Sequence, residues 1–176
     1  MNYRDFGLSA HQERGLLGRA RVRAGDRTPD VLFRDAQTNE PTSLFALIGG
    51  SQVFALLGPS GRPEKLARLT QALGCLGIAC FQVLPESAHS AHDVAGQPDV
   101  AGLIDVTGDF QRLYGARGEF LYLIRPDGYV GLFQRPIDER ALRGYMTKLF
   151  TAGALEDAFA APTLSKQHVQ GREAQI

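Results

Sequence analysis

The chain has 176 residues, of which 44% are hydrophobic and 22% are charged, and these proportions are ordinary for one soluble globular domain with a real core. Its nineteen basic and nineteen acidic residues balance to a formal net charge of zero, so the basic excess that would favour nucleic acid or an anionic membrane as partner is absent. Two cysteines are too few for a disulfide framework, the apolar runs are too short to span a membrane, and the first residues do not have the pattern of a signal peptide, so we expect a cytoplasmic protein.

The first 24 residues are polar, rich in arginine and weakly patterned. We interpret residues 1–24 as an N-terminal arm that either lies on another surface or stays solvated. A domain is expected at residues 25–150. It opens with the turn-forming sequence Gly-Asp-Arg-Thr-Pro-Asp at 25–30, which is followed by a short strand at 31–33 and by a helical turn capped at 42–43.

A strand, a helix and a second strand come next. The compact apolar run at 52–57 predicts a buried strand, and the loop at 58–63 leads into a helix whose Pro63 suits the first helical position. Three leucines form the buried stripe of this helix: Leu66, Leu69 and Leu73. Gly74 ends the helix and the next strand follows at 78–84. A strand–helix–strand unit forms a right-handed crossover between parallel strands, so we expect the strands at 52–57 and 78–84 to be parallel.

The second half of the chain begins with a long polar loop at 85–101, before a short strand at 103–106 and a helix at 108–114. After a hairpin, an amphipathic helix is expected at 138–150. Residues 151–176 form a C-terminal tail that frays or docks on a partner. The element order predicts an α/β fold with a central mixed sheet and helices on both faces.

The hairpin is the most strongly patterned stretch of the chain. Residues 120–124 and 129–133 are almost purely β-forming. Between them, Pro126 presets the backbone angle of a turn and Gly128 accepts a positive φ, which predicts a type I turn closed by a glycine bulge. Because both faces of the hairpin are apolar, we expect it inside the sheet, with layers packed on both sides.

The order of elements resembles the thioredoxin-like fold in its peroxiredoxin-type layout. Five segments are similar to the C-terminal thioredoxin-like domain of flavin-dependent aromatic hydroxylases, the phenol hydroxylase group: 2–5, 25–30, 105–109, 113–115 and, above all, Leu-Ile-Arg-Pro-Asp-Gly-Tyr-Val-Gly-Leu-Phe at 123–133. The resemblance covers roughly residues 1–150. It implies that the chemistry belongs to a separate flavin domain, whose Gly-x-Gly-x-x-Gly spacing does not occur here. We therefore expect no cofactor in this chain, with FAD and NAD(P)H only in a partner or parent protein.

The same resemblance raises the question of thiol chemistry. In thioredoxin-like enzymes the reactive thiol lies at the start of the helix after the first buried strand, where the helix N-terminus lowers its pKa. The corresponding loop has no cysteine, and we interpret it as a degenerate redox loop: Pro59, Ser60, Gly61 and Arg62. Cys75 follows near the helix end and Cys80 lies within a strand, so both are expected to be inert core or near-core residues. The segment 117–120 also lacks the proline that such redox proteins carry there.

The sequence offers two minor candidate sites. The hydroxyl of Ser60 would stabilise a bound thiolate, as in some glutathione transferases, but the added helical domain of those enzymes has no counterpart here. His89, His92 and Asp93 lie in the long loop, and a zinc site usually needs three or four rigidly held ligands. We expect a solvated loop there and no metal site.

We expect a non-catalytic accessory or dimerisation domain that binds a second copy of itself or a flavoprotein aromatic hydroxylase. The candidate interface residues lie around the hairpin turn: Arg125, Asp127 and Tyr129. Of these, Arg125 is either an interface anchor or simply exposed. The alternative function is a thioredoxin-fold oxidoreductase or peroxidase that uses Cys75 or Cys80, and a third is a small-molecule binding protein that uses the loop at 58–63.

Overall fold

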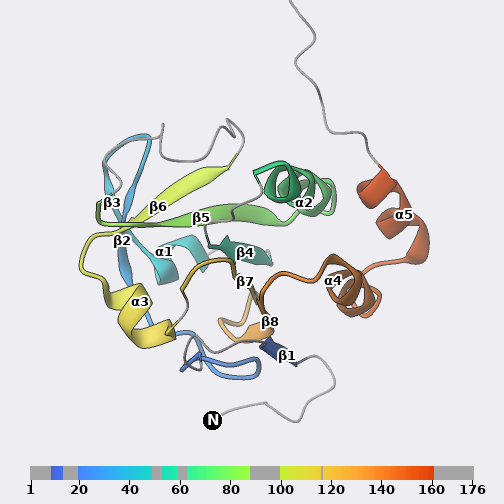
Figure 1. Ribbon diagram of the computed structural model, residues 1–176, viewed down its shortest axis with the longest axis horizontal. Helices are drawn as coiled ribbons and strands as arrows, with labels where there is room; N and C mark the ends of the chain where they lie inside the picture. Colours follow the sequence, from blue (N-terminus) through green and yellow to red (C-terminus); the bar gives the residue numbers. More distant parts are fainter. Residues whose placement is uncertain are drawn as a thin grey trace, which may run out of the picture.

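An eight-stranded mixed sheet forms the centre of the computed structural model (Figure 1). The structure describes residues 9–13, 20–48, 53–58, 63–87, 100–115 and 117–160. Across the sheet the strands follow the order β1 (Ala10–Glu13), β8 (Val130–Arg135), β7 (Leu121–Ile124), β4 (Phe54–Leu57), β5 (Ala79–Pro85), β6 (Ala101–Asp105), β2 (Leu32–Asp35) and β3 (Pro41–Ser43). The pairs β1–β8, β4–β5 and β5–β6 are parallel, as expected for β4 and β5, and the other pairs are antiparallel.

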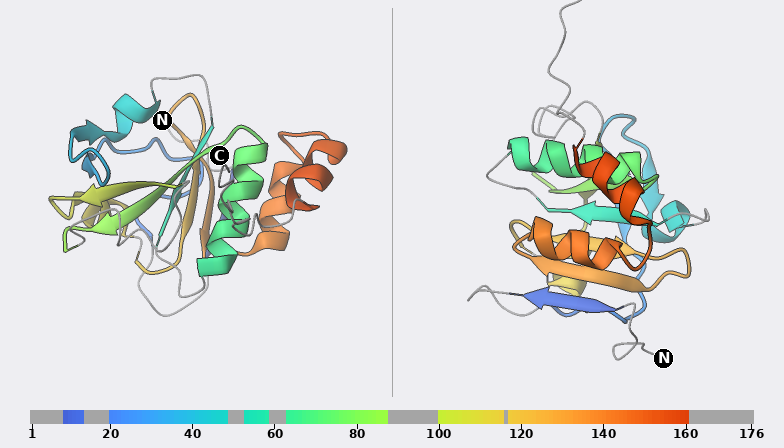
Figure 2. Two further views of the ribbon diagram at one scale, coloured as in Figure 1. Left: turned by 90° about the horizontal axis from the view of Figure 1, so that it is seen from above. Right: turned by 90° about the vertical axis from the view of Figure 1, so that its right-hand side faces the viewer.

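Helices cover both faces of the sheet. Those in the described residues are α1 (Leu44–Ile48), α2 (Pro63–Cys75), α3 (Asp109–Tyr114), α4 (Glu139–Met146) and α5 (Ala152–Ala160). Helices α2, α4 and α5 lie over one face (Figure 2), and α1 and α3 pack on the other. The predicted α/β fold, with a mixed sheet between two helical layers, is confirmed.

The sheet separates two hydrophobic cores because successive side chains of a strand point to opposite faces. In β4, Phe54 and Leu56 pack with α1 and α3, whereas Ala55 and Leu57 pack with α2 and α4. The hairpin strands β7 and β8 are buried along their whole length, as the sequence predicted.

The hairpin turn has the predicted bulge. The Gly128 amide donates to the Arg125 carbonyl at 2.9 Å, and the Arg125 amide donates to the Tyr129 carbonyl at 2.9 Å. Gly128 has a φ of 78°, a left-handed conformation that glycine adopts at little cost. The glycine therefore fixes the register of the two hairpin strands, β7 and β8.

The segment at 25–30 fastens the start of the domain to this hairpin. The Gly25 amide donates to the Val130 carbonyl at 2.7 Å, and the Val130 amide donates to the Asp26 carbonyl at 2.9 Å. Thr28 is buried and donates to the Gly128 carbonyl from both its amide and its hydroxyl, each at 2.9 Å. The turn-forming sequence is therefore a structural clasp between residues about 100 positions apart.

Two elements lie outside the predicted bounds of 25–150. Strand β1 lies within the predicted arm and pairs with β8, where the Arg135 guanidinium donates to the Glu13 carboxylate. Helix α5 lies within the predicted tail, and its Leu155 and Ala158 are buried. Parts of the predicted arm and tail lie outside the described residues: 1–8, 14–19 and 161–176.

Helix α4 is shorter than the predicted helix at 138–150. Asp138 caps its first turn by accepting the Ala141 amide at 3.1 Å. Beyond Met146 the chain continues in tight turns, because the amides at 148 and 149 bond to carbonyls three residues back. Ser43 caps α1, as expected, by accepting the Ala46 amide at 3.2 Å, but residues 41–43 also form the edge strand β3.

Candidate functional site

The position at which thioredoxin-like enzymes carry a thiol lies where β4 ends and the chain turns toward α2. Here the Gly58 amide donates to the Phe120 carbonyl at 3.0 Å. A Cβ atom at Gly58 would lie 2.2 Å from the Gly118 carbonyl oxygen and 2.4 Å from a ring carbon of Phe120. The backbone after β4 is therefore pressed directly against the segment before β7. The predicted degenerate redox loop lies outside the described residues: Pro59, Ser60, Gly61 and Arg62.

The two cysteines occupy different environments, and neither lies at that position. Cys75 is the last residue of α2 and is exposed, which corrects the expectation that it belongs to the core or its margin. It therefore lies at the far end of α2 from the helix N-terminus, where reactive thiols are found. Cys80 lies in β5, where its thiol donates to the Ile78 carbonyl at 3.6 Å and burial raises its pKa to about 12. At neutral pH Cys80 is therefore a neutral thiol, which is a poor nucleophile.

A polar network ties three segments together beside the start of α2. Lys65 Nζ donates to Glu119 Oε1 and to the Ile137 carbonyl, both at 2.7 Å. The Ile137 amide donates to the same Glu119 oxygen at 3.1 Å. Both charged side chains are partly buried, with 28% and 21% of their surface exposed. Sequence reasoning missed this network because its two charged members are 54 residues apart and no local pattern joins them.

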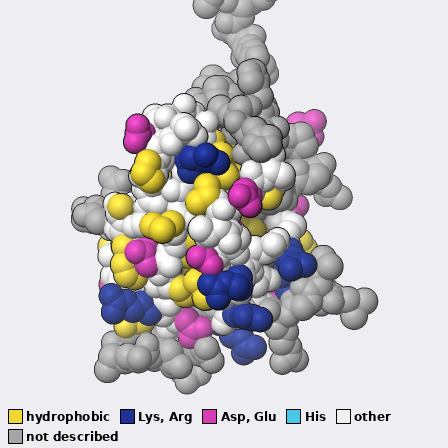
Figure 3. Space-filling view, turned by 90° about the vertical axis from the view of Figure 1, so that its left-hand side faces the viewer, with side chains coloured by type: hydrophobic (Ala, Val, Ile, Leu, Met, Phe, Trp, Pro, Cys, Tyr) yellow, Lys and Arg dark blue, Asp and Glu magenta, His cyan; other side chains and the backbone are white. Residues whose placement is uncertain are grey.

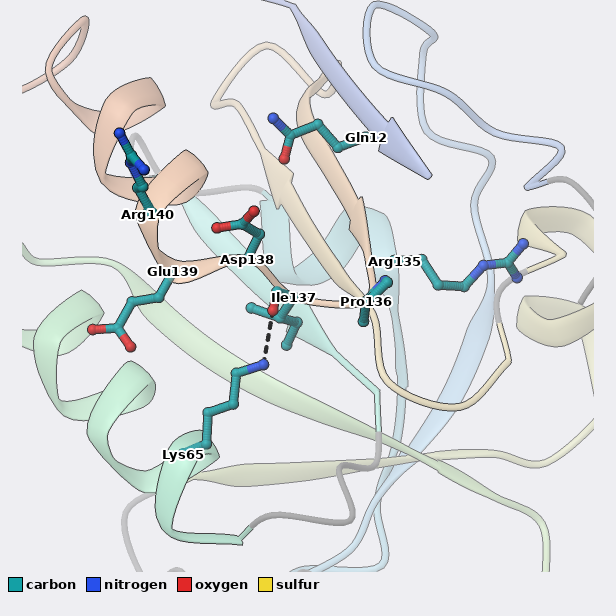
Figure 4. Close-up of a pocket in the computed structure, with 8 residues that line it drawn as sticks. All are labelled: Gln12, Lys65, Arg135, Pro136, Ile137, Asp138, Glu139 and Arg140. Atoms are coloured by element: carbon teal, nitrogen blue, oxygen red, sulfur yellow. Dashed lines mark hydrogen bonds between the residues drawn. The ribbon is translucent and has the colours of Figure 1, made fainter. Parts of the chain in front are cut away.

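This network borders a cavity of about 390 Å³ between β1, the start of α2 and the connection from β8 to α4 (Figure 4). The Arg135 side chain points away from the other residues in that view. Asp138 is occupied in capping α4, and Glu139 binds Arg68 at 3.3 Å. The charged groups of this cavity hold the fold together, and we assign them no chemistry.

The candidate interface residues meet within the hairpin turn. The Arg125 guanidinium donates to the Asp127 carboxylate, which also accepts the Tyr129 amide at 3.3 Å. The Arg125 stem packs over Gly131, where an added Cβ would meet the Arg125 Cγ at 3.3 Å and the Tyr145 hydroxyl at 2.4 Å. These contacts stabilise the turn, and the role of the three residues in binding a partner stays a prediction.

Few large apolar side chains are exposed in the described part of the chain. Leu32 is 60% exposed, Phe45 41% and Leu149 37%. The Arg27 guanidinium lies over the Phe45 ring, 5.8 Å from its centre. On the face that carries β2 and β3, apolar, acidic and basic side chains are interspersed (Figure 3). Such scattered exposure is ordinary and does not identify a partner.

The described residues provide neither a metal site nor a membrane-spanning helix. His89, His92 and Asp93 lie outside the described residues. Within the described ranges, no group of three or more His, Cys, Asp and Glu side chains is placed to hold a metal ion. No helix among these residues has the length and apolar character needed to cross a membrane.

Comparison with known proteins gives one family and one fold. The sequence matches the family described as the HcaD C-terminal domain over residues 29–148. No curated protein matches it. The flavin-dependent monooxygenase PieE, solved with FAD and substrate, matches 82% of this chain at 20% identity with a TM-score of 0.47, and the chain spans only 21% of PieE.

Two peroxidase-type structures match over nearly their whole length. The thiol peroxidase from Chromobacterium violaceum has a TM-score of 0.57 at 14% identity, with 80% of this chain and 95% of that chain covered. The mitochondrial 2-Cys peroxiredoxin from Plasmodium falciparum has a TM-score of 0.56 at 13% identity, with 73% and 96% covered. These similarities confirm the thioredoxin-like fold in its peroxiredoxin-type layout.

Proposed function

Because the chain belongs to the HcaD C-terminal domain family, we propose that it is a non-catalytic thioredoxin-like accessory domain that associates with a flavin-dependent aromatic monooxygenase. The family match agrees with the resemblance, seen in the sequence, to the C-terminal domain of flavin-dependent oxygenases. The match covers most of the sheet and the helices α1 to α4.

The observation that carries the proposal is the chemistry of the thiol position. The loop at 59–62 has no cysteine in the sequence, and the segment before β7 has no proline. Cys75 is at the wrong end of its helix, and Cys80 is held as a neutral thiol by burial. The fold is that of a redox protein, but the residues described here are used for packing and hydrogen bonding.

The proposed role is protein–protein binding, either to a second copy of this chain or to the flavoprotein monooxygenase. In such an assembly FAD and NAD(P)H are bound by the partner or the parent protein, and the reaction is the NAD(P)H- and oxygen-dependent hydroxylation of a phenolic or similar aromatic compound. This chain contributes no catalytic group to that reaction. We favour the flavoprotein over self-association because the family is defined by a C-terminal domain, which implies a larger protein around it.

The test is affinity purification of the tagged chain from its own source, followed by measurement of flavin absorbance and of the mass of the complex. We expect a flavoprotein at a fixed stoichiometric ratio, and the same ratio after the pair is reconstituted from separately purified components. A colourless chain that does not bind the purified flavoprotein would overturn the proposal. A peroxidase or disulfide-reductase activity that disappears in a Cys75→Ser, Cys80→Ser double variant would instead establish the enzyme alternative.

A further inference from the structure

A second cavity, of about 410 Å³, is lined by Arg117, Gly118 and Phe120, the neighbours in sequence of the Glu119 that binds Lys65. We call it the β5–β6 cavity, because it opens where these two parallel strands end, beside α3. In open α/β sheets, ligands bind beyond the carboxyl ends of parallel strands, and the volume falls in the range of small-molecule sites. Its wall at Phe120 is fixed to the end of β4 by the Gly58 hydrogen bond.

The inner part of the β5–β6 cavity is apolar. Leu84, Phe110 and Phe120 line it, and each is buried to at least 97%. Asp105 also lines it, but its carboxylate accepts the amides of Phe110 at 3.1 Å and Gln111 at 3.0 Å, at the start of α3. Both oxygens of this carboxylate are therefore already hydrogen-bonded to the backbone at the start of α3.

The rim carries two opposite charges that are not paired within the described part of the chain. Glu86 follows β5, and Arg117 precedes β7. Neither forms an ion pair or hydrogen bond with a described residue, and they do not pair with each other. The site thus offers one cation and one anion above an apolar floor.

Free space lies over two glycines of the wall. Gly108 and Gly118 have φ values of +66° and +67°, and no atom lies within 4 Å of the position that a Cβ would take at either residue. Their positive φ explains why glycine occurs in these turns. The open space above the backbone leaves room for a bound molecule.

From this arrangement we propose that the β5–β6 cavity binds a free amino acid with an apolar side chain. The carboxylate of the ligand pairs with Arg117, its ammonium group pairs with Glu86, and its side chain covers Leu84 and Phe110. Pairs of a guanidinium and a carboxylate are frequently planar and bidentate, which adds specificity as well as energy. This proposal does not depend on association with a flavoprotein.

The test is a titration of the ¹⁵N-labelled full chain with L-phenylalanine, followed by amide NMR shifts. We expect saturable shifts for residues of the cavity, including Gln111 and Phe120. N-acetyl-L-phenylalanine lacks the ammonium group and L-phenylalaninamide lacks the carboxylate, so each should bind at least about tenfold more weakly. Glycine lacks the apolar side chain and should not compete.

Variants separate this site from non-specific binding. Arg117→Gln and Glu86→Gln remove one charge each from exposed positions, and each should weaken L-phenylalanine at least about tenfold. Gly118→Asn fills the open space with a residue that tolerates positive φ, and it should abolish binding. The matched control is Gly77→Asn. Gly77 has a φ of +72° and open space around it but lies outside the cavity, so this variant should bind L-phenylalanine as the wild type does.

The proposal would be overturned if no saturable shifts occurred, if the shifts were confined to other parts of the chain, or if L-phenylalanine and its N-acetyl derivative bound equally well. It would also be overturned if Gly118→Asn or Arg117→Gln bound L-phenylalanine with wild-type affinity. Because Arg117→Gln changes an exposed side chain, it tests the site even where Gly118→Asn fails to fold.

Discussion

The close approach at Gly58 gives a prediction whose size follows from the geometry. In Gly58→Ala the new methyl group would lie 2.2 Å from the Gly118 carbonyl oxygen and 2.4 Å from the Phe120 ring. Relief requires the backbone of the 117–120 segment to move by about 1 Å, since non-bonded carbon contacts are roughly 3.5 Å. Phe120 is buried, and relief of the contact with the Gly118 carbonyl oxygen needs a backbone shift whichever way its ring turns.

Overpacking of this kind costs about 1–3 kcal/mol, and the involvement of backbone places Gly58→Ala at the upper end. A loss of about 3 kcal/mol lowers the Tm of a chain of this size by roughly 6–12 °C. Urea denaturation followed by circular dichroism measures the change. The control is Gly144→Ala in α4, where an added Cβ meets no atom within 4 Å and where alanine should add up to about 1 kcal/mol.

A free energy of unfolding for Gly58→Ala within about 0.5 kcal/mol of the wild-type value, the range of a neutral surface substitution, would refute the predicted clash. If Gly58→Ala had wild-type stability while Gly144→Ala was more stable than the wild type, the assay would be sensitive enough, and the predicted contact at the end of β4 would be wrong.

Three further results are expected. Glu13→Gln removes the carboxylate that pairs with the Arg135 guanidinium, and Arg135 is only 5% exposed. The free energy of unfolding should fall by about 3 kcal/mol in urea denaturation. An equally small loss in Glu13→Gln and in the exposed control Glu40→Gln would contradict the ion pair. A thiol reagent should label one cysteine of the native protein quickly, and Cys75→Ser should abolish that phase; rapid labelling of Cys80 in this variant would show that its thiol is accessible as thiolate. Because folding raises the pKa of Cys80 from 9.0 to about 12, the stabilisation linked to its neutral form is complete below pH 9 and is lost as the pH rises toward 12, and Cys80→Ser should reduce that loss in denaturation curves.

The parts of the fold that were predicted from sequence are those with a local signal. The hairpin combines two apolar runs with Pro126 and Gly128, whose backbone preferences define the turn without help from distant residues. Helix α2 combines Pro63 at its start with a leucine stripe that faces the sheet. In both cases each residue favours the structure that the whole chain adopts.

The parts that were missed depend on distant partners. Strand β1 reads Ala-His-Gln-Glu, without an apolar pattern, and it joins the sheet because Glu13 and Gln12 bond to side chains of β8 that are 122 residues away. Helix α5 is rich in alanine and has a weak amphipathic pattern, but Leu155 packs into the core and the Phe159 ring lies under the Arg143 guanidinium, 4.3 Å from ring centre to guanidinium carbon. Such contacts are not encoded in the spacing of neighbouring residues.

The candidate sites show the same limit. The absence of a thiol in the loop after β4 was visible in the sequence, and so was the burial of Cys80. The exposure of Cys75 was not visible in the sequence. The rim charges of the β5–β6 cavity, Glu86 and Arg117, belong to two loops that only the sheet order brings together.

The sheet order also has a consequence for synthesis of the chain on the ribosome. Strand β1 is made first, but its neighbour in the sheet is β8, and the Glu13–Arg135 contact spans 122 residues. At about 5–20 residues per second, the ribosome needs roughly 6–24 s to make that interval. Strands β2 and β3, by contrast, are adjacent in sequence and pair with each other as soon as both have emerged. The polar composition of β1 suits this delay, since a strand without large apolar side chains has little tendency to aggregate before β8 has been made.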